Sequence, residues 1–134
     1  MKCFFFVIII FLSASSAFGD DYDLALDKHA QEMATCGAYF TVVYQTLKTS
    51  NDRNDLERAE KFRGQMNEAV KYSILMSSEK ITRARADKEI KEMIRKTDNN
   101  PVANMSVLYN EYGFLCMDVI DNPFKRLKYW LDMK

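Results

Sequence analysis

The chain has 134 residues, with 19 basic and 19 acidic side chains and one histidine, so its formal net charge is zero. A balanced charge provides little attraction to nucleic acid or to an anionic membrane surface. This length allows one domain with a hydrophobic core and is too short for two. We therefore expect a single compact domain whose partner is not a phosphate polymer.

The N-terminus has the features of an export signal. Lys2 gives a positive start, residues 3–12 form an apolar run, and the small-residue segment SASSAFG follows. A retained membrane anchor is the alternative, but the run is about half of the roughly 20 residues that a spanning helix needs. We predict a signal peptide at 1–19, a single helical domain over 20–134, and a location in the periplasm or outside the cell.

Cleavage after Gly19 would change both the charge and the cysteine count. It removes Lys2 and Cys3 and leaves 115 residues with 18 basic and 19 acidic side chains, a net charge of about −1 with neutral histidine. The remaining cysteines, Cys36 and Cys116, are expected to form a disulfide in an oxidising compartment. Two buried thiols are the alternative. A bridge would close a loop of about 80 residues, for which chain entropy gives roughly 4.5 kcal/mol.

The first two predicted elements are amphipathic helices. Residues 23–48 repeat apolar or small residues at steps of three and four, namely Leu26, Ala30, Met33, Gly37, Phe40, Tyr44 and Leu47. After the polar segment TSNDRND, Asn54 and Glu57 have the spacing of a capping box, which predicts a second helix starting near Asp55. The stripe of this helix is Ala59, Phe62, Met66, Ala69, Val70, Ser73 and Met76.

The next segment, 77–96, is mostly charged. The residues that could face a core are Ile81, Ala84, Ile90, Met93 and Ile94. Opposite charges recur four residues apart, as in Glu79 with Arg83, Asp87 with Lys91 and Glu92 with Lys96. This pattern predicts a solvated helix that neutralises itself, and a basic binding stripe is the alternative.

Two Asn-Pro pairs predict the remaining helix starts, because Asn caps a helix and Pro suits its first turn. Asn100 and Pro101 open a helix whose stripe is Val102, Met105, Leu108, Tyr109, Tyr112, Cys116 and Val119. Asn122 and Pro123 open a short terminal helix with Phe124, Leu127, Trp130 and Leu131 as its apolar residues. The predicted fold is all-α, an antiparallel bundle of four to five helices after the signal peptide, stapled by one disulfide.

Few residues suggest chemistry. His29 and Glu32 are three apart and could chelate a metal, but one pair is not a site, and His29 is expected to be a surface residue. A small hydrolase is an alternative, although no nucleophile can be placed beside the histidine. Asn104 begins an Asn-Met-Ser glycosylation pattern at an unfavourable position within a helix. We expect no catalytic residues, no metal ligands and no cofactor.

The C-terminal segment NPFKRLKYWLDMK combines aromatic and basic residues. Lys125, Arg126, Tyr129 and Trp130 form a possible interaction surface. We expect instead that the terminal helix docks its aromatics, with Trp130 largely buried, while the lysine stems cover the rim, and the interaction surface is the alternative.

The segments CGAYF, YNEYGFLC and NPFKRLKYW together resemble small exported all-helical proteins of Gram-negative bacteria and their phages. The resemblance spans most of the chain after the predicted cleavage site and rests on few residues. It implies a periplasmic address and the pairing of Cys36 with Cys116. It implies no catalytic activity, because such proteins are largely of unassigned function.

The expected function is that of a non-catalytic exported protein that acts by binding another protein, not a metal, nucleotide or nucleic acid. The alternatives are a stress chaperone, an inhibitor of a cell-envelope enzyme, and a small hydrolase. A small disulfide-stapled bundle usually acts through its surface. The sequence does not specify the oligomeric state or predict a stable membrane anchor after cleavage.

The export signal leads to a direct test. The intact mass of the protein recovered from the exporting cell should correspond to a chain that begins near Asp20. A membrane-bound species that retains residues 1–19 would contradict cleavage.

Overall fold

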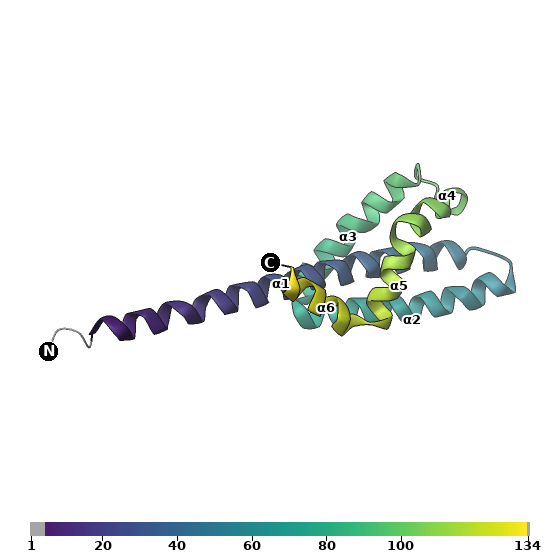
Figure 1. The fold of residues 1–134 in the computed structure, drawn as a ribbon. Helices are drawn as coiled ribbons and strands as arrows, with labels where there is room; N and C mark the ends of the chain where they lie inside the picture. The colour runs from purple at the N-terminus through teal and green to yellow at the C-terminus, as the bar shows by residue number, and fades with distance from the viewer. Residues whose placement is uncertain (1–4, 134) are drawn as a thin grey trace.

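The structure, a computed structural model, describes residues 5–133 of the chain, with side chains described from Gly19 onward. The described residues form helices and no strand (Figure 1). The elements in chain order are α1 (Phe5–Leu47), α2 (Arg53–Met76), α3 (Glu79–Lys96), α4 (Pro101–Leu108), the π-helix η1 (Tyr109–Gly113), α5 (Phe114–Asp121) and α6 (Pro123–Asp132). Since α4, η1 and α5 follow one another without a break, the described chain has five helical rods, and the all-α bundle is confirmed.

Helix α1 lies at the centre of the bundle and packs against every other element. The predicted stripe is buried or partly buried, but the buried surface is wider and also includes Ala34, Ala38, Tyr39 and Val43. Burial of Met33 and Phe40, both 0% exposed, contributes roughly 1.5–3 kcal/mol for each side chain. The buried surface of α1 is therefore wider than one stripe, and Asp27, Lys28 and Gln31 lie on the side that stays exposed.

Helix α2 runs beside α1 in the opposite direction (Figure 1). Gly37 allows the close approach, because a Cβ atom at this position would lie 3.1 Å from Cγ2 of Val70. The predicted stripe of α2 is buried or partly buried, as expected. The predicted cap is wrong: α2 begins at Arg53, and the Asp52 side chain accepts a hydrogen bond of 2.7 Å from the Asn54 backbone N–H. Asp caps a helix as well as Asn does, so the earlier residue starts the helix.

The first half of helix α3 turns a different side to the core than predicted, because Ile81 is 44% exposed and Ala84 is also exposed, whereas Thr82 is buried. In the second half, Met93 is buried and Ile90 and Ile94 are partly buried, as predicted. Buried hydroxyl groups explain the rotation. Ser73 Oγ donates to the Ala30 carbonyl at 2.9 Å, and Thr82 Oγ1 lies 2.9 Å from Ser73 Oγ. Because buried hydroxyl groups need hydrogen-bond partners, Thr82 points into the bundle and the adjacent Ile81 points outward.

The charges on α3 pair partly as predicted. Arg83 binds Glu79 at 2.6 Å. Glu92, however, binds Arg95 instead of Lys96. Lys96 is drawn to Glu111 of η1, on a neighbouring element. The predicted self-neutralisation of this helix is therefore incomplete.

The rod formed by α4, η1 and α5 begins as predicted, with the Asn100 side chain accepting a hydrogen bond of 3.2 Å from the Ala103 N–H. Val102 at its start is 68% exposed and Tyr109 is 49% exposed, so the predicted stripe is wrong at these two positions. The wider π-helical turn then places Leu108, Tyr112 and Cys116 on the buried side at steps of four.

The predicted disulfide is present. Cys36 of α1 and Cys116 of α5 are bonded, their Cα atoms are 5.2 Å apart, and both are at most 1% exposed. The bond joins the central helix to a rod 80 residues later in the chain.

Residues 1–18 of the predicted signal peptide lie outside the residues whose side chains the structure describes, and its cleavage stays a prediction. Within the described residues, no helix combines the length and the apolar character needed to cross a membrane.

The disulfide predicts a large stability change. Replacement of Cys36 and Cys116 by alanine should lower the free energy of unfolding by roughly 2–5 kcal/mol, because the unfolded chain regains the freedom that the closed loop removes. Urea denaturation measures this difference. Reduction of the wild-type protein should have the same effect and should leave the double variant unchanged. An unchanged wild-type midpoint after reduction would contradict the structural role of the bond.

Candidate functional site

Glu32 of α1 is the centre of the most connected polar cluster between two helices. Trp130 Nε1 of α6 donates to Glu32 Oε2 at 2.7 Å. Arg126 Nε, one turn earlier in α6, donates to Glu32 Oε1 at 3.0 Å and to Oε2 at 2.9 Å, and its Nη2 also donates to Oε1. The carboxylate therefore binds α6 to α1 through two residues four positions apart on one helical face.

The Arg126 guanidinium also stacks on aromatic rings of its own helix. Its Cζ atom lies 4.2 Å from the centroid of the Tyr129 ring and 5.4 Å from that of Trp130. Such cation–π contacts fix the planar guanidinium in the orientation that the carboxylate needs.

This environment determines the chemistry available to Glu32. Burial alone would raise its pKa, but the neighbouring His29, the hydrogen bonds from Arg126 and Trp130 and the positive charge of Arg126 outweigh burial and lower the pKa from 4.5 to about 2. A carboxylate that is ionised to such low pH and already accepts several hydrogen bonds is a weak general base at neutral pH. Glu32 is therefore suited to holding two helices together.

His29 is buried, and the expectation of a surface residue is wrong. It is 2% exposed, and its Nδ1 atom lies 3.7 Å from Glu32 Oε2. Nδ1 has no hydrogen-bond partner among the described residues. His29 lies on the side of α1 that other helices cover, so this polar residue is enclosed. Within the described residues, no group of three or more His, Cys, Asp or Glu could hold a metal ion.

Two grooves meet at Trp130. The larger has a volume of about 510 Å³ and is lined by Asp21, Leu24, Ala25, Lys28, Trp130, Leu131 and Met133. The smaller has a volume of about 300 Å³ and is lined by Lys28, Gln31, Glu32, Thr35, Cys36, Leu115 and Trp130. Lys28 and Trp130 line both, so the grooves form one surface along α1 beside α6.

A second ionic cluster joins α3 to η1. Lys96 Nζ donates to Glu111 Oε1 and, at 2.8 Å, to the Tyr112 hydroxyl. The hydrogen bond to Glu111, followed by that to Tyr112, raises the pKa of Lys96. The amine is therefore held in its protonated form, which is not nucleophilic.

The residues of the predicted interaction surface divide into two groups. Arg126 and Trp130 are partly buried and bind Glu32 of the same chain. Tyr129 is 43% exposed, and Lys125 is an exposed side chain 3.8 Å from Asp118. The expectation that Trp130 is largely buried is only partly met. The polar contact with Glu32 orients α6, and as a result Phe124, predicted to be an apolar docking residue, is 79% exposed.

Sequence reasoning did not find the role of Glu32 or the grooves. The four-residue spacing of Arg126 and Trp130 was visible on α6, but their acceptor lies more than 90 residues earlier in the chain. Lys28 and Leu24 had no pattern that could single them out, because a groove depends on the packing of α6 against α1.

No family model matches the chain, and no curated protein or solved structure is significantly similar to it. The resemblance to exported helical proteins therefore stays a prediction.

The low pKa of Glu32 predicts a specific pH dependence. A group whose pKa is lower in the folded state stabilises the fold above its unfolded pKa and loses this contribution as the pH falls through its folded pKa. Glu32→Gln should lower the free energy of unfolding at pH 6 by on the order of 3 kcal/mol. This difference should decline between about pH 4.5 and pH 2. Urea denaturation at several pH values measures it.

Glu57→Gln is the matched control, because Glu57 forms an exposed ion pair with Arg53. Its effect should stay within about 0.5 kcal/mol at every pH. A Glu32→Gln effect that is equally small, or that does not change with pH, would contradict the attachment of α6 to α1 through Glu32.

Proposed function

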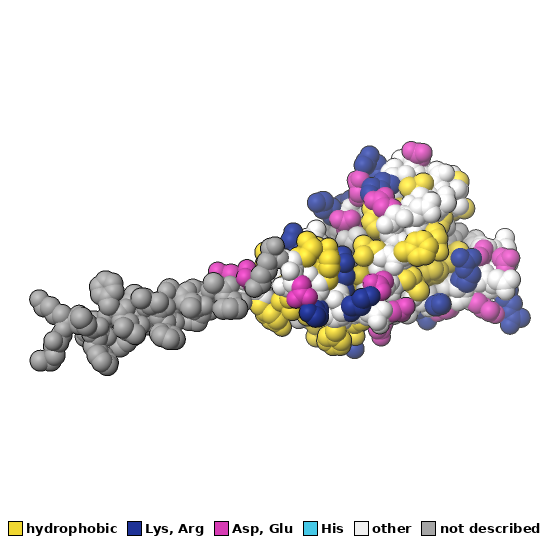
Figure 2. Space-filling model, in the orientation of Figure 1, with side chains coloured by type: hydrophobic (Ala, Val, Ile, Leu, Met, Phe, Trp, Pro, Cys, Tyr) yellow, Lys and Arg dark blue, Asp and Glu magenta, His cyan; other side chains and the backbone are white. Residues whose placement is uncertain are grey.

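We propose that the protein is an exported, non-catalytic protein that acts by binding another protein. The observation that carries this proposal is an exposed pair of aromatic side chains, Tyr109 of η1 and Phe114 of α5. Tyr109 is 49% exposed and Phe114 is 75% exposed, and their ring centroids are 5.7 Å apart. Figure 2 shows apolar side chains gathered over this part of the molecule. Aromatic residues are enriched at the centres of protein interfaces, where they supply much of the binding energy.

The aromatic pair is held on a rigid base. Cys116, two residues after Phe114, is bonded to the central helix. A Cβ atom at Gly113 would lie 3.0 Å from the Tyr109 ring, so the glycine leaves room for Tyr109 to lie against the π-helix. A side chain that is already ordered loses less conformational freedom on binding, and this increases affinity.

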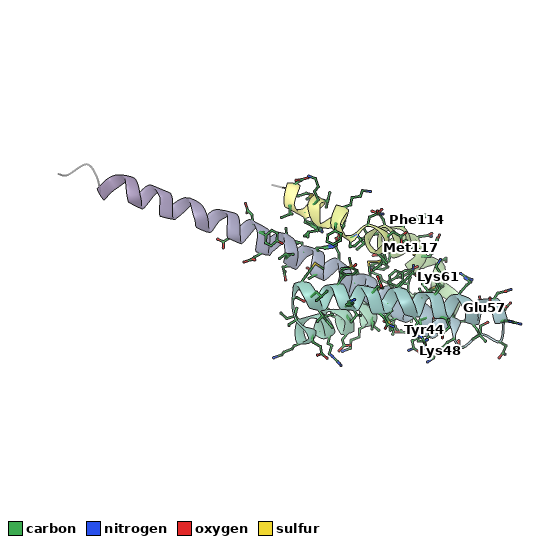
Figure 3. All side chains as sticks on the ribbon, turned by 90° about the horizontal axis from the view of Figure 1, so that it is seen from below. Tyr44, Lys48, Glu57, Lys61, Phe114 and Met117 are labelled. Atoms are coloured by element: carbon green, nitrogen blue, oxygen red, sulfur yellow. A yellow bond between two sulfur atoms is a disulfide. The ribbon has the colours of Figure 1, made fainter. Side chains whose placement is uncertain are left out.

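The surroundings of the pair also suit an interface. Figure 3 shows Phe114 and Met117 on one side of α2, and Tyr44 and Lys48 on the other side. Glu57 and Lys61, which are exposed and opposite in charge, lie on α2 itself. An apolar centre with a polar rim is the usual composition of a protein interface. Met117 adds an adaptable side chain, which accepts a hydrogen bond of 3.1 Å from Gln65.

Site-specific photocrosslinking in the exporting cell tests the proposal. A photoreactive residue at position 114 should give one discrete protein adduct, and Tyr109→Ala should reduce the yield because it removes half of the aromatic pair. The control is the same photoreactive residue at position 102, where Val102 is 68% exposed but lies outside the pair.

The pattern of adducts separates the alternatives. One adduct with a cell-envelope enzyme, together with loss of its activity, would identify an inhibitor. Many adducts at both positions would indicate a chaperone. An adduct yield at position 114 no greater than at position 102, with no discrete product, would contradict the proposal.

A further inference from the structure

We propose that the two grooves along α1 and α6 form one binding site for a single-chain amphiphile with an anionic headgroup, such as a fatty acid. The site lies between the start of the described side chains of α1 and the end of α6 and uses neither Tyr109 nor Phe114. It is therefore a separate function from the proposed protein interface.

The larger groove suits a hydrocarbon chain. Its walls are the apolar side chains of Leu24, Leu131 and Met133, and Ala25 forms a buried floor. Leu24 is 57% exposed and Met133 is 56% exposed, so a ligand in the groove would cover apolar surface that water now reaches. A volume of about 510 Å³ is within the range of ligand pockets, roughly 300–1,000 Å³.

The smaller groove suits a negatively charged headgroup. Lys28 lies where the two grooves meet and forms no ion pair with any described residue, so its charge is available to a ligand. Gln31 and Thr35 follow along the same groove and can donate hydrogen bonds. A single cation with neighbouring neutral donors complements one negative charge and not several.

The acidic residues of the grooves determine the orientation of the ligand. Glu32 lines the smaller groove, but its charge is compensated by Arg126, which binds both of its oxygen atoms. Asp21 lies at the far end of the larger groove and has no basic partner among the described residues. The anionic headgroup should therefore lie at Lys28, and the hydrocarbon chain should extend towards Leu24 and Met133.

Trp130 provides a built-in probe of the site. It is the single tryptophan of the chain and lines both grooves. Addition of dodecanoate, below the concentration at which it forms micelles, to the purified protein with its disulfide intact should change the Trp130 emission until one ligand is bound per chain. Dodecyltrimethylammonium has a hydrocarbon chain of nearly the same length with a positive headgroup and should bind at least 10-fold more weakly.

Four variants test the assigned roles. Lys28→Gln should weaken dodecanoate binding about 10-fold, and Lys28→Arg should restore it, because the charge is what matters. Leu24→Glu should abolish saturable binding by placing a carboxylate in the apolar groove. Leu75→Glu is the matched control: Leu75 is 71% exposed and lines a different groove on α2, so this variant should bind as the wild type does. Circular dichroism of each variant confirms that the helices are intact.

The proposal fails if dodecanoate causes no saturable change in Trp130 emission or if the cationic amphiphile binds equally well. It also fails if Lys28→Gln binds as the wild type does, or if Leu75→Glu loses as much affinity as Leu24→Glu. Binding to vesicles of anionic diacyl phospholipid without binding of monomeric dodecanoate would assign the surface to membranes and contradict a ligand site.

Discussion

The position of α1 at the centre of the bundle is the constraint on which the other helices depend. Every other element packs against it, and its residues between Ala25 and Val43 are buried on most sides. Small residues make this possible, because Ala30, Ala34 and Gly37 let neighbouring helices approach closely. The large side chains between them, such as Phe40, then fill the space towards several partners at once.

Polar interactions and the disulfide fix the orientation of helices that apolar packing alone holds weakly. Helix α6 buries no side chain fully, so apolar contact alone orients it weakly. The hydrogen bonds from Arg126 and Trp130 to Glu32 fix the orientation of α6 against α1, because hydrogen bonds require defined geometry. The disulfide has the same role for α5. Together these two attachments hold Trp130 beside the grooves and Phe114 on the exposed surface, so the two proposed binding sites depend on links to the same central helix.

The sequence predicts the positions of the helices better than it predicts the contacts between them. Helical periodicity and the Asn-Pro pairs located most helix starts, and the two cysteines left after the predicted cleavage identified the disulfide. Periodicity was right for the second half of α3, where Met93 is buried, and wrong for its first half, where Thr82 and not Ile81 is buried, because threonine was treated as a polar surface residue. It also placed His29 on the surface, since one helix gives no information on how many others surround it. The attachment of α6 to Glu32 and the grooves arise from contacts between residues far apart in the chain, and no local pattern encodes them.

The central role of α1 can be measured directly by native-state hydrogen exchange. Amides within residues 30–43 should exchange the most slowly, through global unfolding alone, while those of α6 and of the solvated α3 should exchange faster through local opening. Exchange of residues 30–43 at the rate of α3 or α6 would contradict the account, because the helix that all the others pack against cannot open before they do.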